Sequence, residues 1–126
     1  MKRALQITLI ILSFIPLYFA ARGLIGGAAL ANDGMPVTNG LDNQLRYQMG
    51  YYLSLTLLIW WVIQDLHERG TVLRILVLAI FLGGLARLYS VITVGPPPPH
   101  AIAVMLLEIG APILVLWHKY VGQNIP

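Results

Sequence analysis

Four long apolar runs, separated by shorter polar segments, make up most of this chain. A helix needs about 20 mostly apolar residues to cross the hydrocarbon core of a bilayer, and each run reaches or approaches that length. The pattern therefore predicts an all-α protein with four transmembrane helices, at roughly residues 4–30, 44–64, 71–94 and 100–118.

The connections between the runs predict how the helices are arranged. Asp65–Gly70 reads as a tight polar turn, and Val94–His100 holds four consecutive prolines, which favour a rigid extended segment. Ala31–Asn43 is the longest connection and is rich in turn-forming residues, so we expect it to be irregular. Short connections favour antiparallel neighbours. We expect one domain over residues 1–126, folded as an up-down-up-down four-helix bundle.

Composition adds that lipid is part of the solvent. The chain is 58% hydrophobic and 10% charged, whereas a soluble domain carries about 25% charged residues. It has no cysteine, which excludes disulfides and thiolate metal sites. The net charge of +3 comes from scattered basic residues, so we expect no nucleic-acid partner.

Orientation follows from the distribution of basic residues. The first apolar run is longer than the 7–15-residue core of a signal peptide, so we expect it to remain as a span. With the N-terminus inside, most of the arginines and lysines that flank the runs fall on the inner side, and the three tryptophans lie near that boundary. We therefore expect both termini in the cytoplasm.

Three charged residues interrupt the apolar runs, namely Arg22, Arg87 and Glu108. A charge at the bilayer centre costs about 2.5–3.5 kcal/mol or more unless it is paired or reaches water. Arg87 and Glu108 lie at similar distances from the outer ends of their helices, roughly 10–12 Å by helical rise. All three residues are expected to converge in the outer half of the bundle. Three interpretations stay open: a structural ion network, a polar pocket that binds a ligand, or different depths for these residues, with the Arg22 side chain reaching the membrane surface.

Backbone features near these charges sharpen the picture. Pro112 lacks the N–H that would bond the carbonyl of Glu108, so that carbonyl is expected to be loose. Gly23 and Gly27 form a small-xxx-small pair typical of close helix packing. Gly83 and Gly84 precede Arg87 by about one turn, where close packing is again the expected use.

The segment "LDNQLRY" opens the second apolar run. If the helix begins near Asp42, this aspartate caps its free amides. Gln44, Tyr47 and Tyr51 then share one face, which we expect to point inward toward the buried charges. Arg46 lies about 200° away from Gln44 around the helix. It is expected to anchor at the surface, with membership of the site as the alternative.

Three stretches carry a resemblance to a known family: "LDNQLRY", "FLGGLARL" in the third run, and a proline-rich loop followed by a glutamate in the fourth. Together they resemble a family of small bacterial four-helix integral membrane proteins of unknown function, and more loosely the DoxX-like group. The resemblance implies a four-helix fold in a bacterial cytoplasmic (inner) membrane. It brings no activity, and it puts these residues on the family pattern: Asp42, Asn43, Gln44, Arg46, Tyr47, Arg87 and Glu108.

Candidate chemistry is sparse. The chain has no nucleophile triad spacing, phosphate loop or HExxH motif. His67 and His118 are expected at the solvated inner side, and no histidine lies deep enough to ligate haem, so we expect no metal and no cofactor. Glu108 and Tyr51 could serve as an acid and a base, but no pattern requires catalysis.

The favoured function is a membrane-embedded binding protein with an outer-leaflet polar pocket for a lipid, a quinone or another amphipathic small molecule. One alternative is a small proton-coupled transporter acting as a dimer; it would gain if Arg87 paired with Asp42 instead of Glu108. Another is an accessory subunit of a larger membrane complex, which an exposed Gly23–Gly27 stripe would support. The predicted ligand-binding residues are Arg22, Asp42, Asn43, Gln44, Arg46, Tyr47, Tyr51, Arg87 and Glu108.

Overall fold

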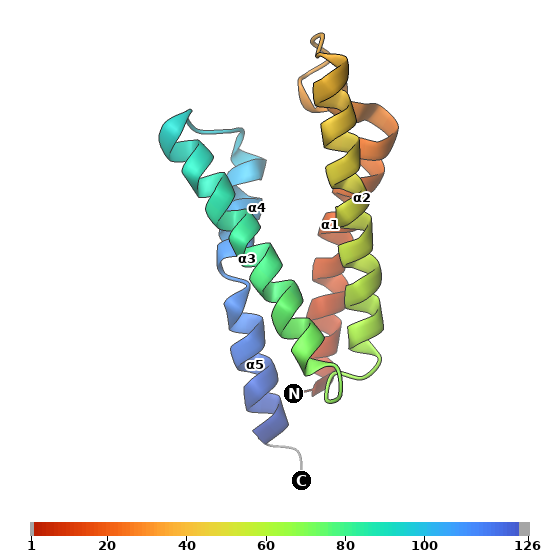
Figure 1. Ribbon diagram of the computed structural model, residues 1–126. Helices are drawn as coiled ribbons and strands as arrows, with labels where there is room; N and C mark the ends of the chain where they lie inside the picture. The colour runs from red at the N-terminus through yellow and green to blue at the C-terminus, as the bar shows by residue number, and fades with distance from the viewer. Residues whose placement is uncertain (1, 124–126) are drawn as a thin grey trace. The chain divides into compact units, whose positions relative to one another are not determined.

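The computed structural model describes residues 2–123, which form helices joined by turns and contain no strand (Figure 1). The all-helical prediction is confirmed. The fourth predicted helix is divided in two by a break at Gly110 and Ala111. The elements are α1 (Lys2–Ala31), α2 (Asn39–Ile63), α3 (Gly70–Thr93), α4 (Pro99–Ile109) and α5 (Pro112–Gln123).

The chain forms two compact units, and the first consists of Gln6–Gln64. In this α1–α2 unit the two helices lie side by side (Figure 1). The Gln6 side-chain amide donates to the Ile63 carbonyl over 2.9 Å at one end. The Ala28 N–H donates to Asp42 Oδ1 over 2.9 Å at the other. The first contact joins the start of α1 to the end of α2, and the second joins the end of α1 to the start of α2. The two helices are therefore antiparallel.

A small polar cluster is buried within the α1–α2 unit. Ser13 and Thr56 are fully buried, and the Trp60 indole N–H donates to Ser13 Oγ over 2.8 Å. The Thr56 hydroxyl donates to the Tyr52 carbonyl within its own helix, with the Ser13 carbonyl also 3.5 Å away. Each buried hydroxyl thus has a partner, which avoids the cost of burying an unpaired polar group.

The second unit comprises the described residues from Asp65 onward together with the start of α1, up to Leu5. Here α3 packs against α4 and α5. His118 of α5 lies with Nε2 2.6 Å from the Leu66 carbonyl, and a Cβ at Gly70 would come within 2.6 Å of its imidazole ring. At the other end of α3, Arg87 contacts Glu108 of α4. The α3–α4–α5 unit is therefore an antiparallel hairpin whose second arm is broken.

Three helical stretches are long and apolar enough to cross a membrane: Lys2–Ala31, Gly70–Thr93 and Pro99–Gly122. Only 22%, 17% and 11% of their most apolar windows are buried inside the protein. Much of their apolar surface is exposed, as at Ile25, which is 84% exposed, and this is the pattern expected of helices that face lipid. Among the described helices α2 falls short of the same hydropathy, because glutamines, tyrosines and an arginine share its first half. Its role as a fourth span stays a prediction.

The start of α2 differs from the prediction. The helix begins at Asn39, five residues before the expected residue 44, and Thr38 is its N-cap. The Leu41 N–H donates to Thr38 Oγ1 over 3.2 Å, so threonine supplies the capping oxygen that was expected from Asp42. The irregular part of the connection is consequently shorter than Ala31–Asn43.

Candidate functional site

Arg87 and Glu108 form an ion pair between α3 and α4. Arg87 Nε lies 3.1 Å from Glu108 Oε1 and 3.2 Å from Oε2. The glutamate side chain is 16% exposed and the arginine side chain 37%. The predicted meeting of these two residues at one level is confirmed. Pairing removes much of the penalty of placing either charge inside an apolar helix.

The close approach of the two helices depends on a glycine. Gly84 is buried on α3, and a Cβ there would lie 2.9 Å from Glu108 Cβ and 3.1 Å from the Ile109 backbone nitrogen. Backbone atoms of α4 cannot move aside as a flexible side chain would. The expectation that glycines before Arg87 serve close packing is therefore confirmed at Gly84, and this packing brings Glu108 within reach of Arg87.

The Glu108 carbonyl is not loose, contrary to the prediction. The Ala111 N–H donates to it over 3.2 Å, and the Gly110 N–H donates to the Leu106 carbonyl over 2.9 Å. Pro112 has no backbone N–H, so one helical donor is missing, but a tight turn between α4 and α5 compensates for the loss. In that turn the N–H of Ala111, three residues after Glu108, replaces the N–H that residue 112 cannot supply. The carbonyl is thus already engaged and is not a ready acceptor for a ligand.

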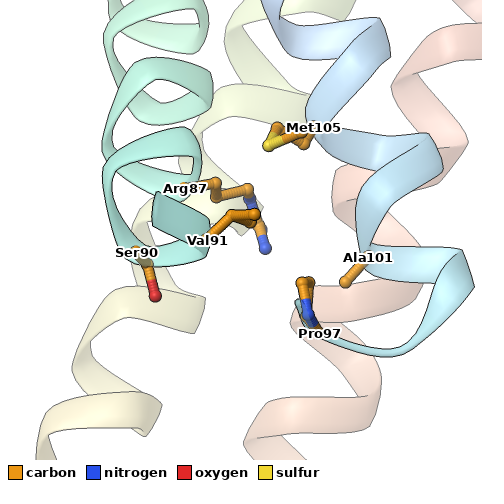
Figure 2. Close-up of a pocket in the computed structure, with 6 residues that line it drawn as sticks. All are labelled: Arg87, Ser90, Val91, Pro97, Ala101 and Met105. Carbon is orange, nitrogen blue, oxygen red and sulfur yellow. The ribbon is translucent and has the colours of Figure 1, made fainter. Parts of the chain in front are cut away.

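A cavity of about 100 Å³ opens beside the ion pair (Figure 2). Figure 2 shows the Arg87 side chain reaching from α3 into the space between the two helices. Apart from Arg87, sequence reasoning missed the lining. Helical spacing could have predicted part of this lining, because residues three or four apart share a helix face. Ser90 and Val91 follow Arg87 by three and four residues on α3, and Ala101 and Met105 are four residues apart on α4. The lining residues are Arg87, Ser90, Val91, Pro97, Ala101 and Met105.

A second charged pair lies in the α1–α2 unit, where it closes a break in α1. Gly27 has φ 67° and ψ −164°, so the helix is interrupted there. Asp42 Oδ1 accepts the Ala28 N–H over 2.9 Å, just after the break. Arg46 donates to the Leu24 carbonyl, just before it. Arg46 Nε also donates to Asp42 Oδ2 over 2.8 Å. We call this arrangement the Asp42–Arg46 clamp.

The clamp changes the interpretation of two predicted site residues. Asp42 caps the break in α1 rather than the start of its own helix. Arg46 donates to a backbone carbonyl, while its side chain is still 42% exposed, so its role as a surface anchor stays a prediction. The Asp–Arg spacing of four residues places both side chains on one face of α2, and that face meets the break. These contacts show that both residues stabilise the backbone at the break in α1. A ligand-binding role for either residue stays a prediction.

The clamp predicts a pH dependence of stability. The hydrogen bond from Arg46, followed by that from the Ala28 amide, holds the pKa of Asp42 below its ordinary value. A carboxyl whose pKa is lowered by folding stabilises the fold above its unfolded pKa, about 3.9, and loses that contribution as the pH falls through the folded value. The melting temperature of the wild type should therefore exceed that of Asp42→Asn by a constant margin from pH 7 to 5, and the margin should shrink below pH 4. An unchanged margin at pH 3 would contradict this reading.

The remaining predicted site residues lie on exposed faces of the α1–α2 unit. Tyr47 and Tyr51 share a face of α2 as expected, with their hydroxyl oxygens 2.8 Å apart and their rings edge to face. Gln44 and Asn43 are exposed. Arg22 Nη1 donates to Tyr18 Oη over 3.3 Å on α1. The predicted convergence of these residues with Arg87 and Glu108 joins two units, and it stays a prediction.

Metal ligation finds no geometric support among residues 2–123. No group of three histidine, aspartate or glutamate side chains there could hold an ion. His67 and Glu68 are exposed neighbours 4.0 Å apart, whereas His118 contacts the Leu66 carbonyl.

The profile of a family described as a domain of unknown function, DUF4345, matches residues 4–118. The chain belongs to this family. The matched residues include the Arg87–Glu108 ion pair, the Asp42–Arg46 clamp and the residues that line the cavity. No curated protein and no solved structure matches the chain. DUF4345 membership confirms the expectation of a family of unknown function, while the "LDNQLRY" signature and the looser DoxX-like relation stay predictions. Function must therefore be argued from the geometry.

Proposed function

We propose that this protein is a membrane-embedded binding protein whose cavity beside Arg87 holds the polar head of an amphipathic small molecule. The observation that carries the proposal is a half-buried guanidinium, paired with Glu108, that lines a cavity between two largely apolar helices. Ligand sites between helices combine apolar walls with a few polar groups that fix orientation, and this cavity has that composition. The surrounding exposed apolar surface would accommodate the tail.

The location follows from the sequence argument. We infer a multi-pass protein of the bacterial cytoplasmic membrane, with both termini in the cytoplasm and the Pro96–Pro99 loop outside. Support comes from the excess of basic residues on the proposed inner side and from the three apolar helical stretches. In this orientation Pro97, and with it the cavity, lies in the outer leaflet.

The contacts that would distinguish a proton-coupled transporter or an accessory subunit from a binding protein do not favour either of these two alternatives. A proton-coupled transporter would have gained from an Arg87–Asp42 pair, but Arg87 contacts Glu108 and Asp42 contacts Arg46. An accessory subunit would have gained from an exposed Gly23–Gly27 stripe. Gly23 instead packs against the Met49 side chain, and Gly27 lies under the clamp.

The proposal is tested by filling the cavity. Ala101→Leu adds three carbon atoms to the cavity wall, whereas Ala103→Leu makes the same change at an exposed position of the same helix. Native mass spectrometry of protein purified in mild detergent should show a bound amphiphile on the wild type and on Ala103→Leu. Ala101→Leu should lose at least about nine-tenths of it, a tenfold change in occupancy. Equal retention by both variants would overturn the proposal.

A further inference from the structure

Arg22 is an exposed charged residue of α1 that lacks a carboxylate partner. Its Nη1 donates to Tyr18 Oη over 3.3 Å, one helical turn away, and among residues 2–123 no ion pair joins it to an acid. The two carboxylates within the described helices, Asp42 and Glu108, are each paired with another arginine. The described residues therefore leave the positive charge of Arg22 without a counter-charge.

The position of Arg22 along α1 places it where the head groups of a bilayer are within reach. It follows Ala4, where the apolar run begins, by about 18 residues, or roughly 27 Å of helical rise. The hydrocarbon core is about 30 Å thick, so Arg22 lies close to the far edge of that core whichever way the chain inserts. Arginines in this region meet lipid phosphates by extending toward them or by thinning the bilayer locally.

The contact between Arg22 and Tyr18 brings two kinds of hydrogen-bond donor together. A guanidinium carries several N–H groups and no acceptor. Because one of these N–H groups donates to the phenol oxygen, the phenolic O–H is free to donate to another acceptor. The Tyr18 ring packs edge to face against Phe19, with centroids 5.4 Å apart, which restrains the phenol. Guanidinium and phosphate match in a two-pronged geometry, so the pair suits a phosphate group.

On the N-terminal side of this pair, α1 presents an exposed apolar strip that fits an acyl chain. Phe14 and Ile11 precede Tyr18 by four and seven residues, so they lie on the same helix face. Their exposed fractions are 55% and 63%. From Arg22 to Ile11 the strip measures roughly 16 Å by helical rise, which is close to half of the hydrocarbon thickness, about 15 Å. One leaflet's acyl chain therefore matches the strip in length.

The acids of the α1–α2 unit determine which head group is preferred. Asp42 pairs with Arg46, and Asp33 lies in the turn beyond α1. A zwitterionic head would bring an ammonium group beside Arg22, with no carboxylate of the described helices left to receive it. An anionic head brings only the charge that the guanidinium attracts.

We propose that Arg22 and Tyr18 bind the phosphate of an anionic phospholipid of the bilayer, such as phosphatidylglycerol, whose acyl chain lies along Phe14 and Ile11. In the proposed orientation this lipid belongs to the outer leaflet. The site lies in the α1–α2 unit, whereas the cavity beside Arg87 lies in the other unit, so this inference does not depend on the proposed function.

The experiment uses the full-length protein in nanodiscs that contain equal amounts of two photoreactive lipids. One is a phosphatidylglycerol and the other a phosphatidylcholine, with identical acyl chains and a diazirine at mid-chain. After irradiation, mass spectrometry identifies the labelled peptides and the attached head group. On the wild type, the segment around Ile11 and Phe14 should carry about fivefold more phosphatidylglycerol than phosphatidylcholine, the selectivity expected from one cation near the membrane surface.

Three variants assign that preference to its residues. Arg22→Gln should abolish it. Tyr18→Phe should weaken it, and because this change removes one oxygen from an exposed side chain, the variant keeps its fold and tests the site independently. Arg3→Gln is the matched control, since it removes the same charge from an exposed position at the other end of α1. It should leave the preference of this segment unchanged.

Several results would overturn the inference. Equal labelling of the wild type by both lipids would show that the site does not select an anionic head. A preference that persists in Arg22→Gln, or that Arg3→Gln also abolishes, would show that it does not arise at Arg22. A preference unchanged in Tyr18→Phe would remove the phenol from the site. If an excess of soluble glycerol phosphate abolishes the preference, the site binds water-soluble phosphates and the assignment to a lipid is wrong.

Discussion

Replacing Gly27 by alanine is expected to lower the free energy of unfolding by about 2–4 kcal/mol. Gly27 has φ 67° and ψ −164°, a region that is essentially restricted to glycine and costs other residues about 1–3 kcal/mol. The added Cβ would also overlap Asp42 Oδ1 and the Arg46 guanidinium. The clamp would have to open, which would expose the Ala28 amide and the Leu24 carbonyl at the break. Thermal unfolding in mild detergent measures the loss.

Two other glycines of the same unit separate the causes of that loss. Gly34 also has a positive φ of 77°, but a Cβ there meets nothing within 4 Å, so Gly34→Ala should cost only the backbone part, about 1 kcal/mol. Gly50 is helical and equally open, so Gly50→Ala should be neutral or stabilising by up to about 1 kcal/mol. A Gly27→Ala protein no less stable than Gly34→Ala would show that the overlap with the clamp has no energetic weight.

Replacing Glu108 by glutamine is expected to destabilise the α3–α4–α5 unit by about 2–3 kcal/mol. The substitution keeps the shape of the side chain and removes the negative charge next to Arg87. Breaking a fully buried pair costs about 3–5 kcal/mol. The Arg87 side chain is still 37% exposed, which lets water compensate part of the loss. Unfolding in mixed detergent and SDS micelles measures the change.

A double-mutant cycle identifies the pair as the cause. Arg87→Gln should cost a similar amount, and the double variant R87Q/E108Q should recover at least about half of the summed loss, because two amides can pair without charge. Arg74→Gln is the matched control. Arg74 is an exposed arginine of the same helix that donates to Thr71 Oγ1, and its loss should stay within about 0.5 kcal/mol. Strict additivity in the cycle would mean that the contact contributes no coupling energy.

The clamp and the ion pair show that similar charged residues can do different work. Asp42 and Arg46 are both engaged with backbone groups of α1, and their positions are explained by the break at Gly27. Arg87 also pairs with a carboxylate but in addition lines a cavity. The polar segment "LDNQLRY" is therefore explained largely by folding, and the region around Arg87 is where a ligand is proposed.

Sequence by itself determined the helical class and the approximate helix positions, and it predicted the meeting of Arg87 with Glu108 while leaving an Arg87–Asp42 pair open. Each of these follows from quantities that can be counted along the sequence, namely the length of an apolar run and the number of residues between a charge and the end of its helix. Apolar run length sets which segments form long helices, and the rise per residue sets the depth of a charge. An unpaired charge in an apolar helix is costly enough that its partner can be named from the few residues at the same depth.

Only the tertiary structure decided how backbone groups were satisfied and where the chain left empty space. The break at Gly27, the use of Asp42 and Arg46 to close it, and the capture of the Glu108 carbonyl by Ala111 are choices among donors that lie close in space. The cavity depends on how side chains from α3, α4 and the proline loop fill volume together. Neither kind of choice leaves a periodic signal in the sequence, because it is settled by contacts between separate segments rather than by position along one helix.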